Sequence, residues 1–262
     1  MKKQIIEGFR SLGKPAQTLA PHWFKPVRIV KRDPALILIP GLLWLISLQS
    51  RSLLIKPSCL GASNSCQKKS VFFLDQLSLG LDIDPADWYS FCTQNISIFL
   101  ALTLPMLWSL YLVLTKKHWN LRSMRQIGAD FFLAIQAIFW NGFFTETSHW
   151  LSQRPRPFVY SDPQVLGVDP AHYTSFYSGH TSVTAAANTI ALLLLISRKA
   201  PAWLLLLDLA VTETLIFSTA FFRMMSARHF LTDVLCGAVA GIFTALFVFG
   251  LHPKEESPHL AG

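Results

Sequence analysis

The chain has 262 residues, of which 52% are hydrophobic and only 15% are charged. A soluble domain of this length must cover its exterior with polar groups, so this composition excludes an ordinary soluble fold and indicates that lipid surrounds the chain. Lys and Arg outnumber Asp and Glu by 23 to 15. The basic residues lie between long apolar runs, and not on one face or in a tail as in nucleic-acid-binding proteins. We therefore expect the lipid bilayer as a partner and no nucleic acid.

Apolar runs along the chain predict its helices, because a helix needs roughly 20 apolar residues to cross a hydrocarbon core. The first run is slightly short and contains Pro40. In chain order, the predicted spans are residues 35–50, 96–115, 127–147, 181–197, 202–222 and 230–251. They predict an all-α integral membrane bundle of about six transmembrane helices.

The predicted domain organisation is a basic N-terminal segment (1–33), a transmembrane domain (34–251) and a short tail (252–262). Positively charged connections are retained on the cytoplasmic side of a membrane. The N-terminal segment and the connections after the second and fourth spans are the basic ones. Both termini are therefore predicted to be cytoplasmic, although Arg51 and Lys56 in the first outer loop count mildly against this. Residues 1–33 fit either an interfacial helix or a disordered tail.

The cysteines fall into two groups. Cys59 and Cys66 lie close together in the first outer loop, where an oxidising compartment would permit a disulfide. Cys92 and Cys236 lie at or within apolar spans and are interpreted as inert packing residues. No Cys/His spacing typical of a metal site occurs in the sequence.

Some residues inside the spans are predicted to be structural. Gly237 and Gly241 permit close helix packing, for which a contact within the chain is favoured over a dimer interface. Acidic residues in or near the spans are expected to face a protein interior or to reach water at an interface, and we assign them no role. They are Glu146, Asp130, Asp208 and Glu213.

Three polar clusters interrupt the apolar pattern at the predicted outer ends of the spans. The first, HWLSQRPRPF, runs from His149 to Phe158. Its prolines stop a helix and fix the backbone, so Arg154 and Arg156 should emerge from a rigid segment. Fixed guanidinium groups match the oxygens of phosphate in pairs. Taken alone, such arginines are more often anchors for lipid headgroups.

The second cluster, SFYSGHTS, precedes the fourth predicted span. Ser178 and Gly179 are small residues at a helix N-terminus and can turn backbone N–H groups toward an anion. His180 would lie beside that anion and could transfer a proton near neutral pH. By itself the tripeptide fits equally well a helix cap followed by a structural histidine.

The third cluster, RMMSARHFLTD, leads into the sixth predicted span. His229 and Asp233 are spaced to share a helix face, so the carboxylate could accept a hydrogen bond from one ring nitrogen and leave the other as a nucleophile. Arg223 could reach the same anion. An isolated pair with this spacing more often forms a buried structural hydrogen bond.

In order and spacing, the three clusters together resemble the signature of the type 2 phosphatidic acid phosphatase superfamily. That signature is Lys, six residues, Arg-Pro; then Pro-Ser-Gly-His; then Ser-Arg, five residues, His, three residues, Asp. The matching stretches here are His149 to Arg156-Pro157, then Tyr177-Ser178-Gly179-His180, then Phe222-Arg223 to His229 and Asp233. The resemblance covers the chain from about the third predicted span to the sixth. It implies the helical core that this family shares with haloperoxidases.

The resemblance also implies a role for each matching residue. His229 would attack phosphorus to form a phosphohistidine, Asp233 would orient it, and His180 would protonate the leaving oxygen. The residues expected to bind phosphate oxygens are Arg156, Arg223, Ser178 and, through its amide, Gly179. The arginines supply the positive charge in this scheme, which requires no metal ion and no cofactor.

Three positions depart from the signature. His149 replaces the lysine and would be cationic only when protonated, so phosphate affinity is expected to be weaker or more dependent on pH unless Arg154 compensates as a phosphate ligand. Tyr177 replaces a proline and Phe222 replaces a serine. Neither of these family residues transfers a proton in the implied scheme, so an active enzyme is expected.

These observations predict a lipid phosphatase in a bacterial inner membrane, with its active site facing the periplasm. The motifs do not choose among phosphatidic acid, phosphatidylglycerophosphate and a polyprenyl diphosphate as the substrate. A lipid phosphotransferase with the same intermediate and a catalytically silent protein that binds lipid headgroups are the alternatives. The sequence does not indicate the oligomeric state or the source organism.

Overall fold

The computed structural model describes residues 32–59, 66–116 and 121–252. Within these ranges the chain is helical and contains no strand, as the sequence predicts. The basic N-terminal segment and the C-terminal tail lie almost entirely outside the described residues, so their predicted conformation stays a prediction.

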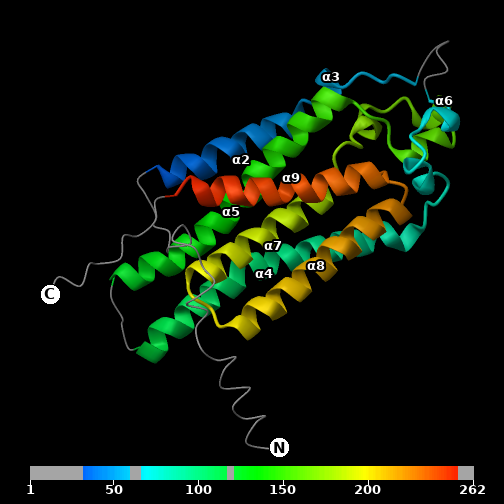
Figure 1. Cartoon of the computed structure of the whole chain (residues 1–262). Coiled ribbons are helices and arrows are strands. Elements are labelled where there is room, and N and C mark those ends of the chain that lie inside the picture. Colours follow the sequence, from blue (N-terminus) through cyan, green and yellow to red (C-terminus); the bar gives the residue numbers. More distant parts are fainter. Residues whose placement is uncertain (1–31, 60–65, 117–120, 253–262) are drawn as a thin grey trace, which may run out of the picture.

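Six long helices form the bundle shown in Figure 1. Five of them are long and apolar enough to cross a membrane, and the first, α2, is shorter at 17 residues. Their bounds are α2 (Asp33–Gln49), α4 (Asp84–Lys116), α5 (Leu121–Ser152), α7 (Gly179–Ser197), α8 (Ala202–Met225) and α9 (Leu231–Gly250). Short helices lie between them: α3 (Arg51–Leu54), η1 (Lys68–Ser70), η2 (Asp75–Ser78), η3 (Pro157–Tyr160), α6 (Pro163–Leu166) and η4 (Pro170–Tyr173).

Two helices extend well beyond their predicted apolar spans. α4 begins at Asp84, whereas the apolar run begins at residue 96, and α5 covers residues 121–152 around a predicted span of 127–147. The added turns are polar, and a hydropathy pattern detects only the part of a helix that suits hydrocarbon. These extra turns place Asp87 and His149 on rigid helices instead of loops.

The central helix of the bundle is α7. In α7, 72% of the apolar stretch that could cross a membrane is buried inside the protein, against 22–44% in the other four candidate spans. The helix packs on α9, α4, α8 and α5. The contact with α9 is close: a Cβ on Gly241 would lie 2.2 Å from the carbonyl oxygen of Ser182, and one on Gly237 would lie 2.7 Å from that of Ser178. The predicted packing role of these glycines within the chain is confirmed, and it holds the first turns of α7 and α9 together.

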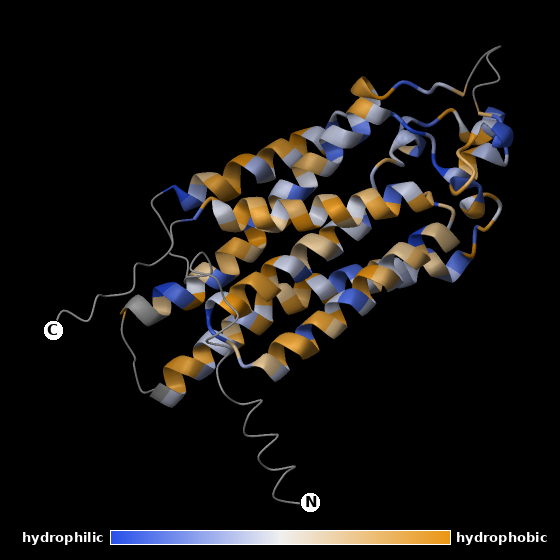
Figure 2. Ribbon diagram, viewed as in Figure 1, coloured by the Kyte–Doolittle hydropathy of each residue, from blue (hydrophilic) through white to orange (hydrophobic). Residues whose placement is uncertain are grey.

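Apolar residues are spread along the long helices of the bundle (Figure 2), as lipid solvation requires. Large hydrophobic side chains such as Leu38, Phe217 and Phe243 are exposed on three different helices. Cys236 is exposed as well, so its interpretation as a packing residue is wrong, whereas the free Cys92 is partly buried. With its apolar helices, the chain is a multi-pass membrane protein.

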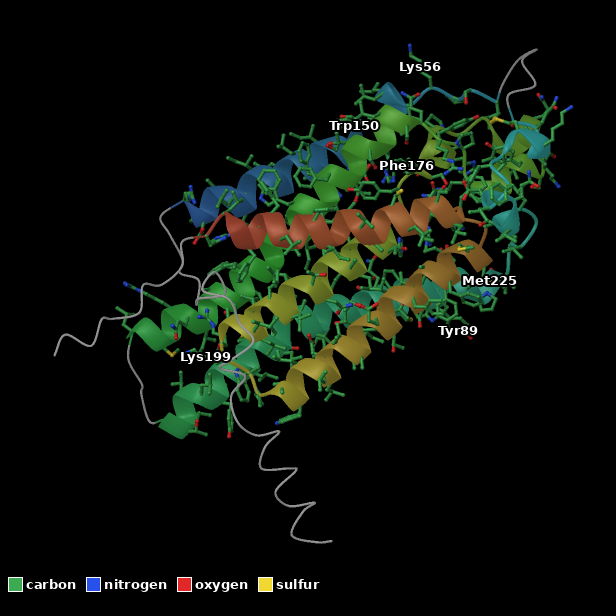
Figure 3. All side chains as sticks on the ribbon, in the orientation of Figure 1. Lys56, Tyr89, Trp150, Phe176, Lys199 and Met225 are labelled. Atoms are coloured by element: carbon green, nitrogen blue, oxygen red, sulfur yellow. A yellow bond between two sulfur atoms is a disulfide. The ribbon has the colours of Figure 1, made fainter. Side chains whose placement is uncertain are left out.

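The start of α2 and the end of α9 lie side by side. Arg32 donates a 2.5 Å hydrogen bond to the carbonyl oxygen of Leu251, and His252 Nε2 lies 2.9 Å from Asp33 Oδ1. A chain that crosses a membrane an even number of times has its first and last helix ends on the same side. The contact between the start of α2 and the end of α9 agrees with such an arrangement. Figure 3 labels Lys199 near this end of the bundle and Lys56, Trp150, Phe176 and Met225 near the other.

The acidic residues of the spans have different environments. Asp130 is buried and forms an ion pair with Arg198 (2.7 Å) and a hydrogen bond with Ser109 (2.5 Å). Asp208 is buried on α8, and Glu213 is exposed. Glu146 is buried at the opposite end of the bundle from Asp130, where it lines the cavity described next.

Candidate active site

The three polar clusters meet at the end of the bundle that carries α3 and α6. One cavity of about 300 Å³ there is lined by residues from every cluster, including His149, Arg156, Gly179, His180, Arg223 and His229. A second cavity of about 630 Å³ is lined by Asp84, Asp87 and Arg228 together with Arg156, His180 and Arg223. The last three residues belong to both cavities and mark where they join.

His229 is a neutral and oriented imidazole. It is 2% exposed and lies just before α9, with Nδ1 2.7 Å from the carbonyl oxygen of Ser175. A carbonyl oxygen only accepts hydrogen bonds, so Nδ1 carries the proton and Nε2 carries the lone pair. Burial, and then the positive charges of Arg223 and Arg156, hold the pKa of His229 well below its ordinary value. A neutral imidazole with a free lone pair on Nε2 is the form that can act as a nucleophile.

Asp233 does not hydrogen-bond to His229 directly. Its Oδ2 lies 4.0 Å from His229 Nδ1, which is too long for a hydrogen bond. The carboxylate instead accepts hydrogen bonds from the hydroxyl of Ser175 (2.5 Å) and from the backbone N–H of Phe230 (2.9 Å). The predicted direct contact is wrong. Asp233 binds the hydroxyl of Ser175, and the carbonyl oxygen of the same Ser175 holds the imidazole of His229.

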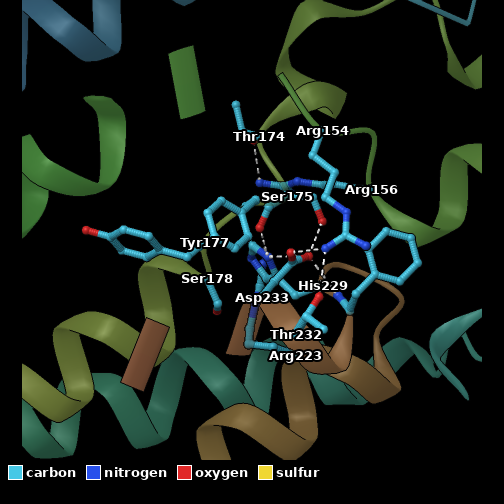
Figure 4. Close-up of polar contacts among 12 residues, drawn as sticks. Arg154, Arg156, Thr174, Ser175, Tyr177, Ser178, Arg223, His229, Thr232 and Asp233 are labelled. Carbon is cyan, nitrogen blue, oxygen red and sulfur yellow. Dashed lines mark hydrogen bonds and ion pairs between the residues drawn. The ribbon is translucent and has the colours of Figure 1, made fainter. Parts of the chain in front are cut away.

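Arg154 belongs to the same network and not to the wall of either cavity (Figure 4). Its guanidinium donates to Asp233 (2.5 Å), Thr232 (2.9 Å) and Asp75 (2.7 Å) and lies 4.2 Å from the ring centre of Phe230. The carboxylates of Asp75 and Asp233 thus bind the Arg154 guanidinium, which was expected to compensate for the missing lysine. The expectation that Arg154 binds phosphate is corrected, and Arg154 is a structural partner of Asp233.

Arg156 and Arg223 each present an unpaired donor. Arg156 donates through Nη2 to the hydroxyl of Thr174 (2.9 Å), and Arg223 donates through Nη1 to Asp87 and to Ser90 (3.3 Å). The Nε atoms of both arginines are buried and have no hydrogen-bond partner among the described residues. Both side chains line the junction of the two cavities. An anion in that position would supply the acceptors that these groups lack.

The second cluster forms the first turn of α7. The hydroxyl of Ser178 caps the helix, accepting from the backbone N–H of Thr181 (3.4 Å), and Ser178 is not among the residues that line either cavity. Its predicted contact with phosphate is therefore not seen in this geometry. Gly179 and His180, the first two residues of the helix, do line the cavity. The first N–H groups of a helix have no intrahelical partner and favour an anion.

His149, at the lysine position of the signature, is buried against other protein groups. Its Nε2 lies 3.2 Å from the carbonyl oxygen of Tyr177, and its Nδ1 lies 3.5 Å from Glu146 Oε2. The other side of Glu146 is bound by Arg51, which also lines the cavity. The ring thus contacts the loop before α7 through Nε2, and its buried Nδ1 has no hydrogen-bond partner among the described residues.

The family of the chain follows from a comparison with family models. A model described as the PAP2 superfamily matches residues 130–257. The chain belongs to this superfamily. Members of the PAP2 superfamily are phosphatases. No significant match was found among curated proteins or among solved structures. All three signature clusters lie within the matched residues.

A disulfide joins Cys59 and Cys66 outside the PAP2 match, as the sequence predicts, with their Cα atoms 5.4 Å apart. The two cysteines pack with Val159 and Tyr173 in one buried cluster. The hydroxyl of Tyr173 accepts from the backbone N–H of Cys59 (3.0 Å) and donates to the carbonyl oxygen of Gly167 (2.7 Å). The disulfide thus anchors the segment that leads into Thr174 and Ser175.

Sequence reasoning missed four charged residues around the PAP2 signature. They are Arg51, Asp75, Asp87 and Arg228. Arg228 lies between Arg223 and His229 and shares Asp87 with Arg223, its Nη2 being 3.2 Å from the carboxylate. The other three precede the matched residues. Their only signal is a charge in the predicted first outer loop, which other residues of that loop share.

Proposed function

We propose that this protein hydrolyses a lipid phosphate monoester or diphosphate through a phosphohistidine on His229. The observation that carries the proposal is that Arg156 and Arg223, each with a buried and unpartnered Nε group, line the same cavity as both histidines. A buried unpaired donor costs about 1–3 kcal/mol, and more when it is charged. A phosphoryl group in the cavity would remove that cost for both arginines.

The first half of the reaction transfers the phosphoryl group to the protein. Nε2 of His229 attacks phosphorus, and an N–P bond forms as the bond between phosphorus and the lipid oxygen breaks. Arg156, Arg223 and the first amides of α7 stabilise the charge on the phosphoryl oxygens. His180, which lines both cavities, donates a proton to the leaving oxygen.

The second half returns the protein to its starting state. His180, now without its extra proton, takes a proton from water, and the resulting nucleophile attacks phosphorus. The N–P bond breaks, inorganic phosphate leaves, and Nε2 of His229 recovers its lone pair. Asp233 and Ser175 keep the ring oriented in both halves, since the Nδ1–H group points at the Ser175 carbonyl throughout.

The cavity also supports a lipid as the substrate. Beyond its polar end, the wall is formed by apolar side chains from the membrane-crossing part of the bundle, namely Trp44, Leu48, Ile98, Ile138 and Val183. A hydrocarbon tail attached to the phosphate would be compatible with this wall. With the charge pattern of the connections, the arrangement favours cytoplasmic termini and a site facing the periplasm.

The test compares wild type with the His229→Ala variant, both purified in detergent. Phosphate release is measured on phosphatidic acid, phosphatidylglycerophosphate and a polyprenyl diphosphate. Wild type is expected to release phosphate from at least one of them and to form an acid-labile phosphoprotein, and the variant is expected to do neither. Transfer to an added acceptor lipid without free phosphate would identify a phosphotransferase. No release and no transfer by wild type would leave a protein that only binds headgroups.

A further inference from the structure

Arg51 reaches the candidate active site from outside the PAP2 match. It is the first residue of α3, immediately after α2, and it lines the same cavity as Arg156, His180, Arg223 and His229. Its side chain is 29% exposed, so it is neither buried in the protein nor free in solvent. A fixed cation at the edge of a phosphate cavity is placed to bind the ligand.

The geometry of Arg51 leaves one edge of its guanidinium free. Nε lies 2.8 Å from Glu146 Oε2 and Nη2 lies 2.5 Å from Glu146 Oε1, in a side-on pair. Glu146 is 3% exposed on α5 and cannot move away without losing this partner. A guanidinium has five N–H donors, and the pair uses two of them. The remaining donors, including both on Nη1, have no partner among the described residues and are available to a second acceptor.

His149 does not supply a cation at this point. Its two ring nitrogens face the Tyr177 carbonyl group and Glu146, so neither is directed at a ligand. Glu146 therefore lies between the histidine at the lysine position and an arginine from another helix. The permanently charged residue that binds Glu146 on the cavity wall is Arg51.

We propose that Arg51 is a substrate-binding residue, which donates to a non-bridging phosphate oxygen and supplies the positive charge that His149 does not. Glu146 is its positioning residue. The inference rests on the proposed function, because it assigns one more ligand to the same phosphate. The competing interpretation is that the pair only fastens α3 to α5.

The experiment must remove the charge of Arg51 without leaving Glu146 buried and unpaired. The comparison is therefore between Glu146→Gln and the double variant Arg51→Met/Glu146→Gln, using the full chain in detergent. The probe is orthovanadate, whose dissociation constant is measured calorimetrically. A charge-assisted hydrogen bond contributes about 1.5–3 kcal/mol, so the double variant should bind the probe about tenfold or more weakly than Glu146→Gln.

Two further variants separate direct binding from general effects. Adding His149→Lys to the double variant puts a cation back at the lysine position and should recover most of the affinity. Lys56→Met removes a positive charge from an exposed side chain that lines neither cavity and should leave the affinity unchanged. Each variant is compared at equal thermal stability and elution volume.

The failures can be told apart. If the double variant binds orthovanadate as tightly as Glu146→Gln, or if His149→Lys recovers nothing, Arg51 is a structural partner and the inference is overturned, while the proposed function stands. If wild type binds the probe but cleaves no lipid phosphate, the proposed function fails and the Arg51 comparison still decides phosphate binding. If wild type neither binds nor cleaves, both are overturned.

Discussion

Arg223 is held in place by acidic and hydroxyl groups from another helix. Asp87 and Ser90, both in the early turns of α4, accept from its Nη1, whereas its buried Nε has no partner among the described residues. Asp87 also pairs with Arg228 at 3.2 Å. One carboxylate therefore positions two cations that line the second cavity.

Replacing Asp87 with Asn should lower kcat/KM about tenfold, because Arg223 loses a charge-assisted hydrogen bond that fixes its free edge. The measurement is the rate of phosphate release from the preferred lipid. Asp84→Asn is the matched control, since Asp84 lines the same cavity on the same helix. Tighter substrate binding in Asp87→Asn would contradict a positioning role and show that the carboxylate competes with phosphate.

The protonation state of His229 gives a second test. Its pKa lies below the ordinary value of 6.5, so the nucleophile stays neutral as pH falls through 6.5. The acidic limb of the kcat/KM profile, corrected for substrate ionisation, should therefore lie below that value. Arg156→Met removes one of the charges that depress the pKa and should move the limb to higher pH. A limb at the ordinary value that Arg156→Met does not move would contradict this assignment.

At this scale, spacing identified the side chains but not their contacts. The structure brings His180 and His229 together with Arg156 and Arg223 around one cavity. The helical spacing of His229 and Asp233 predicted a hydrogen bond that goes instead to the carbonyl group of Ser175. A backbone acceptor leaves no trace in the residue types, so periodicity alone could not have found it.

Between elements, Arg154 is the main connection at this end of the bundle. It joins the segment after α5 to Asp75 of η2 and to Thr232 and Asp233 of α9. The side chains of both carboxylates are almost fully buried. Without the arginine they would keep their charges with no cation beside them.

Arg154→Ala should therefore destabilise the protein by about 3–5 kcal/mol, the usual cost of breaking a buried ion pair from one side. Thermal unfolding in detergent measures the loss, and Arg154→Lys, which keeps the charge but not the forked geometry, should lose less. A variant of normal stability that binds phosphate weakly would restore the original expectation that Arg154 is a phosphate ligand.

Hydropathy predicted the apolar part of each helix and little beyond it. It identified α7, α8 and α9 almost to their ends, because these helices are apolar throughout. It missed the polar first turns of α4 and the last turn of α5, which carry Asp87 and His149. These turns extend past the apolar part of the bundle, where the pattern carries no signal and tertiary contacts decide the conformation.

At the scale of the whole molecule, the apolar part of the bundle separates two ends that carry different polar groups. One end holds both cavities and the disulfide, and the other holds the Asp130–Arg198 pair and the paired ends of α2 and α9. From the charge pattern of the connections, we predict that the second end faces the cytoplasm. The lipid that reaches the cavities would then come from the outer leaflet.

Site-directed labelling tests this orientation. Lys56 and Lys199 are exposed at opposite ends of the bundle (Figure 3). Lys56→Cys and Lys199→Cys are therefore compared with each other, both in a background in which the free cysteines Cys92 and Cys236 are replaced by Ser. In intact cells with a permeabilised outer membrane, an impermeant maleimide should label Lys56→Cys alone, and in inverted inner-membrane vesicles Lys199→Cys alone. Labelling of both from one side would contradict a bundle that crosses the membrane. The reverse pattern would place the cavities in the cytoplasm, and the substrate would then have to come from the inner leaflet.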